Sequence, residues 1–332
     1  MPVRLVGGGA AGAQGVGGIT GRAYNRNRKR RLIMGQFKGV VAATITPFTP
    51  EGKFNEKAFI KIMESNIKAG VDGFWVSGGT GESVLLTEEE VNRTSEISVG
   101  LCKGKAKSII HVGTLTTAAS VRMARVAARA GADAIACVPP FFYGPSEQAI
   151  IEHYKAVADA AGDLPFFVYN QPRYTQVEFT APMLDRIKKA VPQIVGVKHS
   201  APDFNNTRRF KAIGLDVFTG SGSLFLSCLA AGGVGVVDGP LTVSPELWIN
   251  AYRAYQKGNM AEAQKWQDKA NVLIDLAAKY GMQATCKALC DVKYGVECRE
   301  PRRPILPLSR EQKKELVSAA EKAGVLGVGG GV

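Results

Sequence analysis

The stretch QIVGVKHSA, residues 193–201, places one lysine behind a run of apolar residues. Residues 194–197 are typical of a buried strand, because continuous apolar runs mark strands that are covered on both faces of a parallel sheet. Lys198 ends this run. Either the strand reaches water there, which is the commoner case for a single strand-end lysine, or the lysine lies in a pocket and its amine reacts.

Runs of the same kind recur from residue 36 onward. They begin near 40–47, 73–78, 108–113, 134–139, 165–170, 194–199, 216–220 and 234–239. Consecutive runs start roughly 20–35 residues apart, which suits one crossover helix between each pair of parallel strands. Gly70 and Gly131 each follow a helical segment and fit the left-handed cap of a helix end.

Eight strand–helix units predict the α/β fold called a (β/α)8 or TIM barrel, with a C-terminal helical extension. The expected organisation is a basic, Gly/Arg-rich flexible leader, the barrel, the extension and a short flexible tail. Their expected ranges are 1–34, 35–243, 244–326 and 327–332.

The leader carries much of the positive charge of the chain. Of the formal net charge of +13, residues 1–33 contribute +7, because they contain seven Arg and Lys and no acid. A solvated tail before a working start at Met34, a transit segment and a nucleic-acid-binding arm are the three interpretations. The first predicts a cytoplasmic protein, the second a mitochondrial one, and nucleic-acid binding is the least favoured.

Composition excludes several classes of protein. Hydrophobic residues make up 45% of the 332 residues, which is enough for a full core. No apolar run approaches the ~18–20 residues of a membrane-spanning helix. The six cysteines form no CxxC pair and the three histidines are not at ligand spacing from them, so we expect free thiols, no metal and no cofactor.

Reactive groups of such barrels lie at the C-terminal ends of the strands. The second strand is followed by SGGTGES (77–83), the fifth ends at Tyr169 and the sixth at Lys198. Burial disfavours the charged form of an amine, and a neutral amine can form a Schiff base with a ketone. A neighbouring tyrosine can transfer protons, and glycine-rich turns expose N–H groups that bind a carboxylate. Together these groups predict a site for a 2-oxo acid.

The region from about residue 36 to 326 resembles the dihydrodipicolinate synthase / N-acetylneuraminate lyase family of class I, Schiff-base aldolases. The matching motifs are GGTGES (78–83), YNQP (169–172), GVKHS (196–200) and PPFFYGPS (139–146). In combination they are specific for the family and weakly specific for the substrate. KSIIHVGTLT (107–116) is similar to the lyase branch.

The resemblance implies roles for the matching residues. Lys198 would form the Schiff base and Tyr169 would be the proton shuttle. The carboxylate would be held by Thr80 with the N–H groups of Gly79 to Gly81, and Val237 would line the methyl side of pyruvate. The family also implies a homotetramer built as a dimer of dimers.

Departures from the family pattern bear on the substrate. Gly79 replaces a Thr or Ser that links tyrosines in a proton relay, and Phe142 replaces a tyrosine donated across the dimer. Arg173 is shifted by one position from the arginine of the synthases, and GSGS (220–223) replaces the acidic pair of the sialic acid lyases. A divergent, lyase-like member with a different aldehyde pocket is therefore expected, with Gln171, Arg173 and Ser221 as candidate pocket residues.

Three functions remain open at this point. The first is an aldolase that reversibly cleaves a 4-hydroxy-2-oxo acid to pyruvate and an aldehyde. The second is a dehydratase or decarboxylating dehydratase of a keto-deoxy sugar acid, which uses the same lysine imine and would fit Gly79. The third is a non-catalytic barrel whose basic leader binds nucleic acid.

Overall fold

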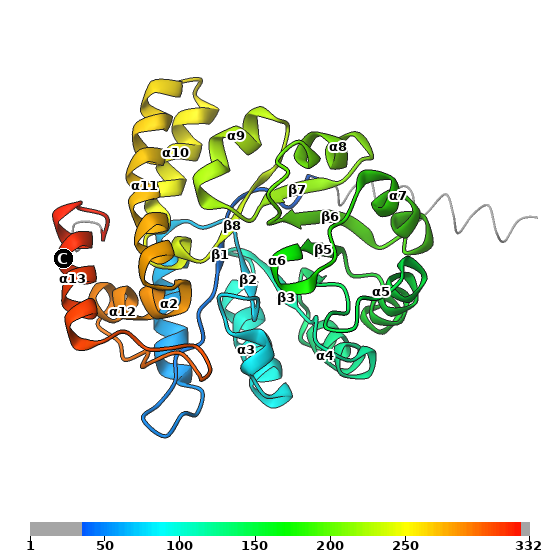
Figure 1. The fold of residues 1–332 in the computed structure, drawn as a ribbon, viewed down its shortest axis with the longest axis horizontal. Helices are drawn as coiled ribbons and strands as arrows, with labels where there is room; N and C mark the ends of the chain where they lie inside the picture. Colours follow the sequence, from blue (N-terminus) through cyan, green and yellow to red (C-terminus); the bar gives the residue numbers. More distant parts are fainter. Residues whose placement is uncertain (1–34, 327–332) are drawn as a thin grey trace, which may run out of the picture.

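Eight parallel strands close into a barrel in the computed structural model, which describes residues 35–326 (Figure 1). Each strand pairs with its neighbours in sequence, and β1 pairs with β8. The strands are β1 (Gly39–Ala43), β2 (Gly73–Val76), β3 (Lys107–His111), β4 (Ala134–Cys137), β5 (Phe166–Asn170), β6 (Ile194–His199), β7 (Asp216–Thr219) and β8 (Gly235–Asp238). The predicted fold and all eight predicted strands are confirmed.

Helices surround the ring of strands in Figure 1. Those between the strands are α2 (Glu56–Ala69), α3 (Glu88–Cys102), α4 (Thr117–Ala130), α5 (Glu147–Ala161), α6 (Pro172–Thr175), α7 (Ala181–Ala190), α8 (Asn206–Ala212) and α9 (Phe225–Ala230). Short 3-10 helices are η1 (Ser83–Leu85), η2 (Gly222–Leu224) and η3 (Pro240–Thr242). As expected, Gly70 and Gly131 end α2 and α4 in left-handed conformations, with φ of 95° and 87°.

Successive residues of each strand face two different apolar layers. On β1, Val40 and Ala42 pack toward the helices, whereas Val41 and Ala43 belong to a smaller cluster inside the barrel. Trp75, Phe167 and Phe218 fill most of that interior. The period of two that places alternate side chains on opposite faces of a strand produces both layers. The barrel is therefore a filled core, with room for ligands only at its ends.

A register shift between β5 and β6 sets the direction of Lys198. Phe166 pairs with Ile194, but the next residue, Phe167, pairs with Gly196, so Val195 is an extra residue on β6. An extra residue reverses the alternation that follows it. Ile194 belongs to the outer layer, and without the shift Lys198 would face outward as well. The bulge turns Lys198 toward the barrel interior.

The C-terminal helices are α10 (Pro245–Gln256), α11 (Met260–Tyr280), α12 (Met282–Tyr294) and α13 (Arg310–Lys322). They lie together on one side of the barrel in Figure 1, and α12 lies beside α2. The domain boundary predicted at 243/244 falls in the turn between η3 and α10. None of the helices in residues 35–326 combines the length and apolarity that crossing a membrane requires. The predicted leader and tail lie outside the described residues.

A buried ion pair joins α12 to the loop after β2. The Nζ atom of Lys287 lies 2.5 Å from Oε1 of Glu82, and both side chains are almost completely buried. The backbone N–H of Arg302 donates to the other carboxylate oxygen of Glu82 at 2.6 Å. Burial lowers the pKa of Lys287, and the carboxylate of Glu82 opposes that shift. Each charge of this pair depends on the other, because neither is in contact with water.

Replacing Lys287 with Met should lower the free energy of unfolding by about 3–5 kcal/mol, because the carboxylate of Glu82 would stay buried without its counter-charge. The double variant E82Q/K287M should lose less, since it removes both charges. Urea unfolding followed by circular dichroism measures the difference. The exposed pair of Arg93 and Glu56 supplies the control, for which R93M should have a small effect. A loss in K287M no larger than in R93M would contradict a structural role of the buried pair.

Candidate active site

Lys198 and Tyr169 are adjacent at the C-terminal ends of β6 and β5. They are register partners, and Nζ of Lys198 lies 4.4 Å from the ring centroid of Tyr169. The ring of Trp75 on β2 lies on another side of the amine, with its centroid at 4.9 Å. The exposed fractions are 4% for Lys198 and 6% for Tyr169. The lysine therefore ends in an aromatic pocket at the mouth of the barrel, and not in bulk water.

Glycines provide the space for this lysine. A Cβ atom on Gly196 would lie 2.4 Å from the ring of Phe167 and 2.5 Å from a backbone oxygen of β7. A Cβ atom on Gly220 would lie 1.7 Å from Oγ of Ser200 and 3.3 Å from Cε of Lys198. These contacts are closer than side chains tolerate, so glycine at 196 lets β6 pack against Phe167 and β7, and glycine at 220 leaves room beside Lys198.

The loop after β2 is held by contacts from both sides. Its backbone takes left-handed conformations at two residues other than glycine, Ser77 and Glu82, with φ of 54° and 63°. The Nε2 amide of Gln283 on α12 donates to the Gly79 carbonyl at 3.1 Å, and the hydroxyl of Thr46 donates to the Gly81 carbonyl at 2.8 Å. Side chains from outside the turn thus hydrogen-bond to two of its carbonyls, and these bonds fix the direction of the peptide groups between them.

Thr80 and Gly79 face different parts of the site. A Cβ atom on Gly239, directly after β8, would lie 2.9 Å from the hydroxyl of Thr80, so Thr80 lies against the end of β8. A Cβ atom on Gly79 would lie 3.8 Å from the hydroxyl of Tyr169. The glycine-rich loop therefore reaches from Tyr169 on β5 to the end of β8.

Asp238 closes the site beneath the loops of β7 and β8. Its two carboxylate oxygens accept hydrogen bonds from the N–H groups of Gly222 and Gly239, both at 2.7 Å. Burial raises the pKa of this carboxyl group, while those two bonds and the charge of Lys198 act in the opposite direction. Asp238 thus holds the two loops together at the base of the site.

His111, at the end of β3, contacts the site in a way that the sequence analysis missed. Its Nδ1 lies 3.0 Å from the carbonyl oxygen of Ser77. Since a carbonyl can only accept, Nδ1 carries the hydrogen and Nε2 is left as an acceptor. Nε2 is buried without a hydrogen-bond partner among the described residues. The ring meets Tyr169 edge-on at 5.7 Å, and burial lowers the pKa of His111 to about 4.

His199 faces away from Lys198, as the period of a strand requires. Its Nε2 bonds to the carbonyl of Asp203 at 2.9 Å, its Nδ1 lies 3.1 Å from the amide nitrogen of Asn170, and its ring packs against Phe210. These partners hold the outer side of β6.

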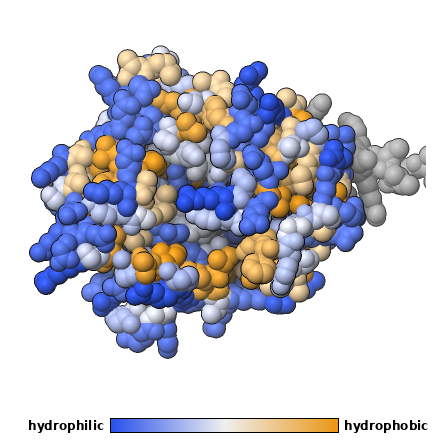
Figure 2. Space-filling view, in the orientation of Figure 1, coloured by the Kyte–Doolittle hydropathy of each residue, from blue (hydrophilic) through white to orange (hydrophobic). Residues whose placement is uncertain are grey.

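A cavity of about 470 Å³ opens beside Tyr169. It is lined by Gly79, Glu82, Ser83, Val84, Leu85, His111, Val138, Phe141, Tyr169, Gln171, Tyr174, Thr175, Gln283, Pro304 and Ile305. Figure 2 shows hydrophobic residues grouped below the middle of the face that Figure 1 presents, with hydrophilic residues at its centre. The exposed side chains of Val84 and Phe142 belong to loops at this end of the barrel. The cavity extends outward from the phenol of Tyr169.

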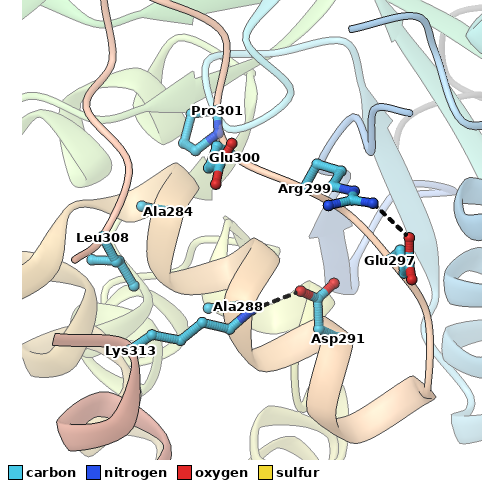
Figure 3. Close-up of a pocket in the computed structure, with 9 residues that line it drawn as sticks. All are labelled: Ala284, Ala288, Asp291, Glu297, Arg299, Glu300, Pro301, Leu308 and Lys313. Carbon is cyan, nitrogen blue, oxygen red and sulfur yellow. Dashed lines mark hydrogen bonds and ion pairs between the residues drawn. The ribbon is translucent and has the colours of Figure 1, made fainter. Parts of the chain in front are cut away.

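A second cavity, of about 270 Å³, lies within the C-terminal extension (Figure 3). Its charges pair with one another, since Lys313 bonds to Asp291 at 3.1 Å and Arg299 lies 3.3 Å from Glu297. None of the strand-end residues lines it. The cavity beside Tyr169 is therefore the candidate active site.

The structure separates the other predicted pocket residues. Gln171 and Gly79 line the cavity beside Tyr169. Arg173 is exposed on α6, with its guanidinium 6.0 Å from the ring of Tyr174. Val237 is buried inside the barrel, and the N–H of Ser221 donates to the hydroxyl of Thr219 at 3.1 Å. No cluster of three or more His, Cys, Asp or Glu within residues 35–326 has the geometry to hold a metal ion.

The barrel and the contents of its mouth define a lyase of the (β/α)8 type that forms Schiff bases. The chain belongs to the Dihydrodipicolinate synthetase family, whose sequence model matches residues 36–323. The predicted family and the predicted class of enzyme are thereby confirmed.

Known relatives point to two activities within this family. The chain is 33% identical over 300 residues to a 4-hydroxy-tetrahydrodipicolinate synthase of Phenylobacterium zucineum, covering 89% of this chain and all of the relative. It is 31% identical to an N-acetylneuraminate lyase of an Enterobacter species, with 86% and 97% covered. The solved sialic acid aldolase of Ruminococcus gnavus is similar with a TM-score of 0.84 and 28% identity, with 88% and 98% covered.

Lowering the pH should destabilise the fold through His111. The pKa of a histidine in the unfolded chain is about 6.5, and in the fold that of His111 is about 4. Below pH 6.5 the unfolded chain binds the proton first, so the free energy of unfolding falls between pH 6.5 and 4. Between pH 7.5 and pH 5.0, the free energy of unfolding of the wild type should fall by about 2 kcal/mol more than that of H111Q. Urea unfolding of both proteins at both pH values measures this difference. If the wild type and H111Q lost the same free energy of unfolding, a neutral His111 would be contradicted.

Proposed function

We propose that the protein is an aldolase that reversibly cleaves a 4-hydroxy-2-oxo acid to pyruvate and an aldehyde through an imine on Lys198. The observation that carries this proposal is the buried amine of Lys198 against the ring of Tyr169 at the mouth of the barrel. The solved aldolase of Ruminococcus gnavus is known also as a catalytic-lysine mutant, at 28% identity. That relative thus depends on a lysine, and Lys198 is the buried lysine at a strand end here.

Imine formation uses the lysine and the tyrosine together. The nitrogen lone pair of Lys198 adds to the C2 carbonyl of the 2-oxo acid and gives a carbinolamine. The carbinolamine takes up one proton, loses water and becomes the iminium ion. Tyr169, on the neighbouring strand, is the group that carries this proton, because it is the acid–base side chain in contact with the amine.

Carbon–carbon cleavage then uses the iminium as an electron sink. The C4 hydroxyl gives its proton to the Tyr169 phenolate that the loss of water left behind. The C3–C4 bond breaks, and its electron pair moves into the iminium to give an enamine while the aldehyde departs. Tyr169 then returns this proton to C3. Protonation of the enamine at C3 and addition of water to the imine release pyruvate and the free lysine. The reverse sequence makes the bond, so the same residues serve synthesis and cleavage.

The carboxylate of the 2-oxo acid would bind to the loop after β2. Thr80 and the N–H groups of residues 79–81 form the part of this loop that lies between Tyr169 and Gly239. Bonds from Gln283 and Thr46 to carbonyls of the loop leave donors for an anion on its other side. Val237, Gln171 and Ser221 remain proposed contacts of the substrate.

A dehydratase of a keto-deoxy sugar acid is the second candidate, and Gly79 favours it. No hydroxyl stands at residue 79 to relay a proton to Tyr169, although a Cβ atom there would lie 3.8 Å from the phenol. A dehydratase retains all carbon atoms and a decarboxylating dehydratase loses only carbon dioxide, whereas an aldolase divides the carbon chain between two products. Incubation with 4-hydroxy-2-oxo acids and analysis by mass spectrometry therefore separates the two, since only the aldolase releases free pyruvate.

We also propose an oligomeric state and a cellular location for the protein. Phe142 and Tyr143 are 76% and 91% exposed, and their rings contact each other with centroids 4.9 Å apart. Exposed aromatic pairs of this kind suit a contact with a second copy of the chain, as in the proposed homotetramer. A cytoplasmic location is proposed as well, with a mitochondrial one as the alternative. The basic leader, which carries that alternative and the nucleic-acid alternative, lies outside the described residues.

Treatment with pyruvate and borohydride should add one reduced adduct to Lys198. The variant K198A should show no adduct and no measurable aldol cleavage, because the imine cannot form. Lys189 supplies the matched control, since it is exposed on α7 and pairs only with Asp185 across one helical turn; K189A should be trapped like the wild type. Intact mass and peptide mapping make the measurement. A wild-type mass that pyruvate and borohydride leave unchanged would refute the proposed function.

Replacing Gly239 with Ala should weaken the use of pyruvate. The added Cβ atom would lie 2.9 Å from Thr80 and 2.7 Å from the sulfur of Met282, so the carboxylate loop must move. We expect kcat/KM for pyruvate to fall about 10- to 100-fold. Gly100→Ala in α3 is the control, since a Cβ atom there meets nothing within 4 Å and the residue is far from the proposed carboxylate loop in sequence. Equal kinetics of G239A and wild type would mean that Thr80 does not contact the substrate.

A further inference from the structure

The cavity beside Tyr169 has walls that are mainly apolar. Val84 and Leu85 come from η1, Val138 and Phe141 from the loop after β4, and Ile305 from the segment before α13. Its volume of about 470 Å³ is that of a site for a small molecule. Because Tyr169 also lines it, a group bound there lies directly beside the proposed proton shuttle.

The charged groups at this cavity are already paired. Glu82 is the only acidic side chain among the described residues that line it, and Lys287 with the N–H of Arg302 binds its carboxylate. The guanidinium of Arg302 bonds to both oxygens of Glu90 at 2.7 and 2.8 Å. Arg173 is not a lining residue. A charged substrate group would therefore be buried here without a counter-charge, which is unfavourable.

His111 lines the cavity, and one of its ring nitrogens is a buried acceptor that lacks a donor among the described residues. Nε2 of His111 is buried without a partner, and the bond from Nδ1 to Ser77 keeps the hydrogen on the other nitrogen. Leaving a buried acceptor without a partner costs free energy, so the site gains when a ligand supplies a donor. In the aldol, the C4 hydroxyl is such a donor, and it lies on the side of the substrate that departs as the aldehyde.

We propose that this cavity is the acceptor subsite and selects an uncharged aldehyde with an apolar body, while Nε2 of His111 accepts the hydrogen bond of the C4 hydroxyl in the aldol. This inference rests on the proposed aldolase and goes beyond it, because it names the class of aldehyde. It contrasts with a subsite for an aldehyde that carries a carboxylate, an ammonium group or a polyol chain.

The apolar wall can also be tested by giving it a charge. Ile305 lines the cavity and is half-buried, whereas the next residue, Leu306, is 70% exposed and does not line it. A lysine at position 305 would bring an ammonium group to the wall, and a lysine at position 306 would remain in solvent. The two variants carry the same charge and differ only in whether it reaches the cavity.

The experiment compares aldehydes in the direction of synthesis, with pyruvate in excess and the aldol measured by mass spectrometry. Isovaleraldehyde and benzaldehyde represent the uncharged class, and glyoxylate and succinic semialdehyde the carboxylate class. For the wild type we expect kcat/KM to be at least about tenfold higher for the uncharged class. I305K should reduce or reverse this ratio, and L306K should keep it. An equal or higher kcat/KM for the carboxylate class in the wild type would overturn the proposal.

Two variants of His111 test the acceptor. H111F removes Nε2 and keeps a ring, so kcat/KM for the uncharged aldehydes should fall at least about tenfold. H111Q offers an amide oxygen and should recover part of the loss. Borohydride trapping with pyruvate on each variant shows whether the imine half of the site is folded. Unchanged aldol kinetics in H111F with normal trapping would overturn the role of His111, whereas failed trapping in the wild type would refute the aldolase itself.

Discussion

The contact between the amine of Lys198 and the ring of Tyr169 is the interaction on which the rest of the site depends. It requires Lys198 to face the barrel interior, and the extra residue Val195 makes it do so by reversing the alternation of β6. It also requires Gly196 and Gly220, because any side chain there would collide with the backbone or with Ser200. A backbone irregularity and two glycines thus create the place for the nitrogen that we propose as the nucleophile.

The C-terminal helices support this site from outside the barrel. Through Gln283 and Lys287, α12 bonds to Gly79 and Glu82, the two ends of the turn that carries Thr80. A buried ion pair contributes little net stability when both charges have to be desolvated, but its geometry is specific, since misplacing either charge is costly. The extension therefore fixes the position, relative to Tyr169, of the loop that we propose to bind the carboxylate.

The sequence predicted the barrel well, because apolar runs at crossover spacing report directly on parallel strands that are buried on both faces. It also brought Lys198 and Tyr169 to one end of the barrel by the strand-end rule. The bulge of β6 was not predictable, since the run from Ile194 to Val197 looks regular in one dimension. His111 ends β3 and could have been noticed by the same rule, but its missing partner depends on three-dimensional packing. The direction of Arg173 depends on the turn of α6, which the order of residues does not encode locally.

The two halves of the proposed reaction are built from different kinds of structure. Strand ends and crowded glycines hold the imine half, where a small displacement of Lys198 would separate it from Tyr169. Side chains of η1, of the loop after β4 and of the segment before α13 line the other half, and Val84 and Ile305 can change there without touching a strand. In barrels of this kind the strands and helices provide stability, and the loops at the C-terminal ends of the strands set the specificity. Relatives that are named for different activities can therefore share one barrel, and the aldehyde proposed for this protein follows from its loops.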